Sequence, residues 1–149
     1  MPGFSRFWSL GSPEQNILPL YHPGWVAHGL VASSVPDLAG LLSAIFGGSF
    51  FGPELLDQML SPVTVSAEHP VFRRPGYGLG VMQGDSDLGE VVGHGGEGPG
   101  YSAGVLHWPG EHLTCAALID HDQPQAGLFL AHALGLSFTG RESPPERPC

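Results

Sequence analysis

The chain contains no lysine, and arginine supplies all five of its positive charges. Against 14 aspartates and glutamates, they leave a formal net charge of −9 over 149 residues. Nucleic acids and anionic membrane surfaces are bound through basic patches, so this charge balance argues against both partners. Without lysine, the chain by itself has neither a lysine general base nor a lysine Schiff base.

Long apolar runs are also missing. None reaches the length of about 18 residues that a membrane-spanning helix requires, so we expect no membrane span. Residues 1–12 lack the charged-then-apolar pattern of a signal peptide, which makes a cytoplasmic location the default expectation. Of the two cysteines, Cys115 lies in an apolar run and is expected in the core. A disulfide between Cys115 and Cys149 stays open, so cysteine usage leaves the compartment undecided.

The composition that remains is that of a globular protein. Hydrophobic residues make up 42% of the chain and charged residues 13%, which is typical of a folded domain rather than a disordered one. A chain of 149 residues corresponds to about one domain. The 23 glycines and 15 prolines indicate short elements joined by frequent turns.

Three segments have helical patterns. Residues 34–46 place apolar side chains three and four residues apart, with Ser34 as N-cap and Asp37 at the third helical position. A shorter helix is expected at 53–60 and a last one at 124–138. We interpret Asp37 as a helix cap rather than a catalytic acid.

The region after Gly76 has the shorter period of β-strands. Residues 84–87 and 109–111 have the composition of tight turns, and residues 62–75 are expected to form a loop. The apolar run from Leu113 to Ile119 predicts a central strand that is covered on both faces. Together these patterns predict an α+β fold with flanking helices and an antiparallel sheet of about four strands. The expected strands are 77–83, 88–94, 101–107 and 112–120.

The segment from Val91 to Ser102 carries the most chemical information. It surrounds His94 with five glycines between positions 93 and 100. Glycine lets the backbone approach other groups closely, so backbone N–H groups beside an imidazole indicate a ligand site.

Several motifs occur in a fixed order along the chain. They are Gly24-Trp25, His28 to Ser34, Pro36 to Ala39, Tyr77 to Val81, Gly93 to Gly96, Gly98 to Ser102, and an apolar strand ending at Asp120. In this order, residues 24–135 resemble the C-terminal portion of the serine β-lactamase-related family, which includes class C β-lactamases, D-alanyl-D-alanine carboxypeptidases and esterases. The resemblance implies a partial β-lactamase/transpeptidase-like fold. It divides the chain into an irregular segment 1–23, a domain portion 24–138 and a disordered tail 139–149.

The resemblance also implies site residues. The family builds its site from Ser-x-x-Lys, Tyr-x-Asn or Tyr-x-Ser, and Lys-Thr-Gly or His-x-Gly, and His94-Gly95-Gly96 matches the last. His94 would polarise the site, Gly95 and Gly96 would let the substrate lie against the strand, and Tyr101 would contact it. The backbone N–H of Glu97 would donate to the oxyanion. Such a donor is worth about 3–4 kcal/mol in comparable enzymes.

The other two family motifs are missing. Ser-x-x-Lys cannot occur without lysine, and neither Tyr21, Tyr77 nor Tyr101 begins Tyr-x-Asn. We expect Tyr77 and Trp25 to be core or pocket-wall residues. The chain is therefore interpreted as a C-terminal fragment or degenerate member of a serine hydrolase family, inactive alone.

Completed by an N-terminal half, it would act on a small acyl or peptide-like substrate without metal or cofactor. Family members are often periplasmic or secreted, which leaves localisation open. The alternative is a non-catalytic remnant that associates with itself or a partner through an exposed sheet edge.

The sequence also contains features of two other kinds of site, a serine nucleophile elbow and a metal site. Gly100 to Gly104 matches the Gly-x-Ser-x-Gly of α/β-hydrolases around Ser102, and Asp120, Asp122 and His132 follow in the required order. That motif needs a helix after the serine, whereas a strand is expected here. A metal site would draw on His107 and His112, which flank one turn, or on His121 beside Asp122. No spacing typical of metal ligands accompanies them, so no metal is predicted.

Overall fold

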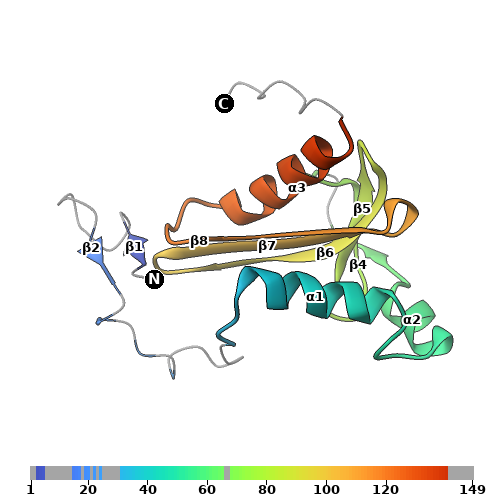
Figure 1. Ribbon diagram of the computed structural model, residues 1–149, viewed down its shortest axis with the longest axis horizontal. Helices are drawn as coiled ribbons and strands as arrows, with labels where there is room; N and C mark the ends of the chain where they lie inside the picture. The colour runs from blue at the N-terminus through green and yellow to red at the C-terminus, as the bar shows by residue number, and fades with distance from the viewer. Residues whose placement is uncertain are drawn as a thin grey trace.

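The computed structural model describes residues 3–5, 15–17, 19, 20, 22, 24, 31–65 and 68–140 (Figure 1). Trp25, His28, Cys149 and the rest of segment 141–149 lie outside the described residues. The elements are β1 (Phe4–Ser5), β2 (Gln15–Asn16), α1 (Val35–Phe46), α2 (Pro53–Met59), β3 (Val63–Thr64), β4 (Arg73–Tyr77), β5 (Met82–Ser86), β6 (Gly89–Gly98), β7 (Tyr101–Trp108), the 3-10 turn η3 (Pro109–Glu111), β8 (Leu113–Ile119) and α3 (Ala126–Phe138).

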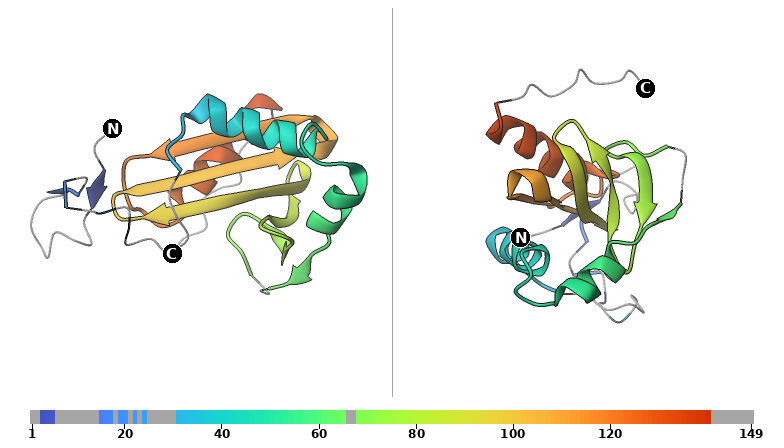
Figure 2. Two further views of the ribbon diagram at one scale, coloured as in Figure 1. Left: turned by 90° about the horizontal axis from the view of Figure 1, so that it is seen from below. Right: turned by 90° about the vertical axis from the view of Figure 1, so that its right-hand side faces the viewer.

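The main sheet is an antiparallel meander with strand order β3-β4-β5-β6-β7-β8. The predicted α+β fold, with an antiparallel sheet and flanking helices, is confirmed. The sheet has six strands rather than about four. Figure 2 shows that the long β6–β7 hairpin extends well past the shorter strands β3 to β5. This difference in length positions the candidate site.

The extra strands correct the prediction for residues 62–87. Residues 62–75 are not a plain loop, because they contain β3 and most of β4. The predicted strand 77–83 is interrupted by a turn, in which the Gly78 N–H donates to the Val81 carbonyl at 2.8 Å. Gly84, which the sequence pattern predicts in a turn, lies within β5. A Cβ there would come within 2.6 Å of the Arg73 carbonyl oxygen, so glycine allows close strand packing rather than a turn.

Helices cover the sheet on both faces: α3 lies on one side of β7 and β8, and α1 on the other (Figure 1). The prediction that Leu113–Ile119 is covered on both faces is confirmed, but β8 is the last strand of the sheet order rather than a central one. The cap of α1 is as predicted, because the Asp37 N–H donates to Ser34 Oγ at 3.3 Å. Of the helices in the described ranges, none combines the length and apolarity needed to cross a bilayer.

The core lies between the sheet and α3, and two glycines let the helix and the sheet approach each other closely. A Cβ on Gly104 of β7 would lie 2.4 Å from the backbone of Gly127 in α3. Cys115 packs in the same core as a buried free thiol, and burial raises its pKa. The fully buried or nearly buried core residues are Val71, Phe72, Leu88, Val91, Leu106, Trp108, Cys115, Ala117, Leu128, Ala131 and Leu136.

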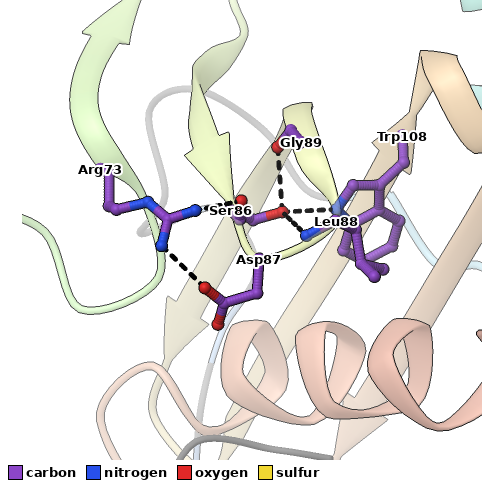
Figure 3. Close-up of polar contacts among 6 residues, drawn as sticks. All are labelled: Arg73, Ser86, Asp87, Leu88, Gly89 and Trp108. Atoms are coloured by element: carbon purple, nitrogen blue, oxygen red, sulfur yellow. Dashed lines mark hydrogen bonds and ion pairs between the residues drawn. The ribbon is translucent and has the colours of Figure 1, made fainter. Parts of the chain in front are cut away.

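A polar contact fixes the end of β7 to the β5–β6 turn. The Trp108 indole is fully buried and donates from Nε1 to Ser86 Oγ at 2.8 Å (Figure 3). The same oxygen accepts from the Leu88 N–H at 3.2 Å and donates to the Gly89 carbonyl at 3.1 Å. Arg73 joins this network: its guanidinium donates to the Ser86 carbonyl and pairs with Asp87 at 2.7 Å (Figure 3). One hydroxyl thus satisfies a buried indole and a buried backbone N–H, which would otherwise be costly.

We predict that Gly104→Ala destabilises the protein by about 1–3 kcal/mol, because the new methyl must push α3 away from the sheet. For a chain of this size, the melting temperature should fall by roughly 2–4 °C for each kcal/mol. Gly96→Ala is the matched control in the same sheet, since a Cβ there would lie 3.6 Å from its nearest neighbour. Equal melting temperatures for the two variants would contradict the close α3–β7 contact.

Candidate active site

Half of β6 lacks a partner on one side. Strand β5 pairs with β6 only from Gly89 to Gly93, whereas β7 pairs with β6 from Val92 to Gly98. Residues 94–98, which we call the β6 edge, therefore face no strand on the β5 side within the described part of the chain. An unpaired strand edge presents backbone N–H and C=O groups that can bind an extended ligand.

His94 lies at the start of the β6 edge and is exposed. Its Nε2 is 2.9 Å from the Tyr77 hydroxyl, and the two rings meet edge to face with centroids 5.8 Å apart. Its Nδ1 contacts the carbonyl oxygen of Gly95. Two polar partners on different elements thus hold the imidazole at the edge of the sheet.

The face of the sheet that His94 occupies follows from the strand register. His94 pairs with Val105, which is two residues from His107 on the same face of β7. The His107 ring stacks on Phe46 of α1 with centroids 5.4 Å apart. His94 therefore lies on the α1 face of the sheet, opposite α3.

The side chain and the backbone N–H of Glu97 have different surroundings. The carboxylate accepts the N–H of Gln125, the residue before α3, at 2.5 Å, which suits a negative charge at a helix N-terminus. Along a strand, every second residue points its backbone groups to the same side. The Glu97 N–H therefore points to the same side as the Gly95 carbonyl that His94 contacts.

The glycines of the β6 edge are not required by packing within this chain. A Cβ on Gly95 would lie 3.8 Å from its nearest neighbours and one on Gly96 3.6 Å, both ordinary contacts. By contrast, a Cβ on Gly93 would lie 2.1 Å from the Val105 carbonyl oxygen. A side chain could therefore be accommodated at Gly95 and Gly96, and neither glycine is needed to avoid a collision inside the chain.

Tyr101 lies apart from the other predicted site residues. It follows the β6–β7 turn, four residue pairs along the hairpin from His94, or about 13 Å at strand spacing. Its ring packs so closely on Gly3 that a Cβ there would lie 2.5 Å from it. A substrate contact for Tyr101 stays a prediction.

The structure does not support a nucleophile elbow at Ser102. Ser102 is 2% exposed and lies within β7, which continues as a strand to Trp108. Its Oγ accepts the N–H of Gly127 in α3 at 3.0 Å. A buried serine in a continuous strand cannot reach a substrate, so its role is to hold α3 on the sheet.

No group of three or more histidine, cysteine, aspartate or glutamate side chains suited to a metal ion occurs among the described residues. His107 instead contacts Thr114 across the β7–β8 hairpin, with Nδ1 2.8 Å from Oγ1. His121 Nδ1 accepts the Gln123 N–H at 3.0 Å.

Comparison with known proteins identifies the family. The family model described as Beta-lactamase matches residues 2–137, more of the N-terminal region than the motifs from residue 24 onward indicated. The chain belongs to the beta-lactamase family. Among solved structures, this beta-lactamase-family chain is similar to a D-stereospecific amidohydrolase from Streptomyces sp., with a TM-score of 0.74 and 27% identity over 94% of the chain. The chain spans 39% of the length of that amidohydrolase. None of the curated proteins matches it.

Sequence reasoning about this beta-lactamase-family chain missed the part that Tyr77 plays at the candidate site. We expected Tyr77 in the core or a pocket wall, whereas its hydroxyl contacts His94. The strand register explains the contact. Tyr77 pairs with Met82 and Met82 with Gly93, which places Tyr77 level with the start of the β6 edge. Predicting this register from the sequence would have required the turn at Gly78–Val81. The strand-like alternation of residues 77–83 gave no sign of that turn.

His107, behind the β6 edge, should make the stability of this beta-lactamase-family chain depend on pH. Burial lowers its pKa, and the charge of nearby His112 lowers it further. As the pH falls through the ordinary value of 6.5, the unfolded chain takes up a proton that the folded chain does not, so the free energy of unfolding decreases. We expect urea denaturation to show lower stability at about pH 5.5 than at about pH 7.5, and His107→Gln to reduce the difference. A pH dependence unchanged by this substitution would show that His107 does not contribute.

Proposed function

We propose that this chain forms the His-x-Gly wall of an acyl-transfer site, in which the β6 edge binds the substrate. The observation that carries the proposal is the imidazole of His94 at the start of an unpaired strand edge, beside two glycines that packing within this chain does not require. Domain portion 24–138 supplies this wall. His94, Gly95, Gly96 and the Glu97 N–H are its working groups.

The backbone geometry supports these roles. The Gly95 carbonyl and the Glu97 N–H point to the same side of β6, so one can accept from and the other donate to a ligand that lies along the strand. With its carboxylate held at the start of α3, Glu97 presents its N–H without a negative charge on the ligand side. This arrangement suits an oxyanion, which a nearby carboxylate would repel.

We propose that the nucleophile comes from residues outside this chain. No lysine is present, and Ser102 is buried in β7. In the proposed reaction, a serine hydroxyl attacks a carbonyl carbon and forms a tetrahedral oxyanion. The leaving group then departs with a proton, and water hydrolyses the resulting ester. This chain contributes the oxyanion donor and the wall that orients the substrate.

An amide is the preferred substrate class. The similar solved structure is named as a D-stereospecific amidohydrolase, and an extended amide would match the backbone groups of the β6 edge. We therefore propose a small amide or peptide-like substrate with a D-configured residue beside the scissile carbonyl. Ester and lactam carbonyls are accessible to the same chemistry.

We predict that the chain alone neither turns over nitrocefin or p-nitrophenyl acetate nor becomes acylated by a fluorescent penicillin. Hydrolysis is followed by absorbance, and acylation by gel fluorescence. Robust turnover would overturn the assignment of an incomplete site. Its loss in Ser102→Ala would then point to the Gly-x-Ser-x-Gly alternative, with that variant's fold checked by circular dichroism.

Substrate binding can be tested without turnover. An N-acyl D-amino acid amide titrated into ¹⁵N-labelled chain should shift the backbone amide signals of Gly95 to Glu97. Gly96→Val should abolish these shifts, because its side chain would project from the same face as His94 and obstruct a ligand beside the imidazole. Gly110→Val, at a glycine with no neighbour within 4 Å, should leave them unchanged. Shifts that occur only elsewhere would refute the β6 edge as the binding surface.

A second candidate function is association with a partner. Helices α1 and α2 contain no buried residue, and the region around them exposes large apolar side chains: Leu41 is 47% exposed, Leu55 56% and Phe50 60%. Such a surface favours association. We expect size-exclusion chromatography with light scattering to show oligomers, and Leu41→Glu with Leu55→Glu to reduce them. A stable monomer at high concentration would count against self-association.

A further inference from the structure

The contacts of His94 define its protonation pattern. Its Nδ1 meets the carbonyl oxygen of Gly95, and a carbonyl oxygen can only accept a hydrogen bond. Nδ1 of the neutral ring must therefore carry the hydrogen, and Nε2 must carry the lone pair. The Tyr77 hydroxyl, 2.9 Å from Nε2, is then the donor in that contact.

Tyr77 reaches His94 because of where the β4–β5 hairpin turns. Tyr77 is the last residue of β4, and the chain turns back between Gly78 and Val81 to begin β5 at Met82. Met82 pairs with Gly93, so β5 starts one residue short of His94. The Tyr77 hydroxyl contacts Nε2, and its ring meets the imidazole edge to face.

We propose that Tyr77 is a positioning residue that, together with the Gly95 carbonyl, holds the tautomer and the orientation of His94. Its effect on acyl transfer rests on the proposed function above. With the Tyr77 hydroxyl donating to Nε2 and the Gly95 carbonyl accepting from Nδ1, the neutral ring has no free N–H. It can accept a proton at Nε2, and a proton leaving that nitrogen passes beside the Tyr77 oxygen. The pair thus makes this wall a proton acceptor while His94 is neutral.

Two properties favour this role over simple packing. Tyr77 is only half-buried and His94 is exposed, so their hydrogen bond is not needed to satisfy buried polar groups. The ring also has a restraint on each nitrogen, and restraint of both nitrogens is how proteins select one histidine tautomer.

The experiment is ¹⁵N NMR of histidine-labelled chain at a pH where His94 is neutral, with its signals assigned from a His94→Gln sample. His69 is an internal reference of the opposite tautomer, because its Nδ1 accepts the N–H groups of Val71 and Phe72 at 3.2 and 3.1 Å. We expect His94 to be protonated at Nδ1 and His69 at Nε2. A His94 protonated mainly at Nε2 would overturn the proposal without any substitution at Tyr77.

Tyr77→Phe then tests the cause. Loss of the donor should move the His94 Nε2 signal and change its tautomer ratio by roughly five-fold, the effect expected for one hydrogen bond. The His69 signals should stay in place, which also reports that the fold is retained. Unchanged His94 signals in a folded Tyr77→Phe variant would refute the positioning role.

These outcomes are independent of catalysis. A fixed His94 tautomer together with no substrate binding at the β6 edge would refute the proposed function and leave the Tyr77 assignment standing. Substrate binding at the β6 edge, with His94 signals unchanged in Tyr77→Phe, would support the proposed function and refute the positioning role of Tyr77.

Discussion

The fold depends on the direct approach of α3 to β7 through two glycines. Gly104 and Gly127 bring the helix and strand backbones into contact, and the Gly127 N–H donates to the buried Ser102 hydroxyl at 3.0 Å. Helix α3 is thereby fixed to one face of the sheet, and the carboxylate of Glu97 is held at its start. Helix α1 covers the opposite face, and the β6 edge has no strand partner on the β5 side among the described residues.

The glycines of this chain serve two different purposes. At positions 93, 104 and 127 a Cβ would collide with backbone atoms of the chain itself, so the residue is required for packing. At positions 95 and 96 the chain leaves ordinary space around a Cβ. The two kinds of glycine cannot be told apart in the sequence. Only the packing in the folded chain distinguishes glycines that the fold requires from glycines that it does not.

The sequence was sufficient for the elements with strong local signals. Ser34 and Asp37 marked the start of α1, and the turn at Pro109 to Glu111 separated β7 from β8. It was insufficient around Tyr77, because residues 76–80 alternate as a strand does, while Gly80, with a φ of +74°, lies in a turn. Without that turn the β4–β5 register is lost, and with it the contact between Tyr77 and His94. The resemblance located His94 in the family motif, but its orientation also depends on Tyr77, a partner 17 residues earlier in the sequence.

Exposed apolar surface and the candidate chemistry meet on the α1 face of the sheet. Helix α3 buries Leu128, Ala131 and Leu136, whereas α1 on the other face buries none of its residues. His94 lies on this α1 face, as the register with Val105 and the stacking of His107 on Phe46 indicate. A segment that covered α1 would therefore approach the sheet from the side on which the imidazole lies. Under the proposed function, a partner segment that packed on α1 would lie on the side from which a hydroxyl could approach the β6 edge.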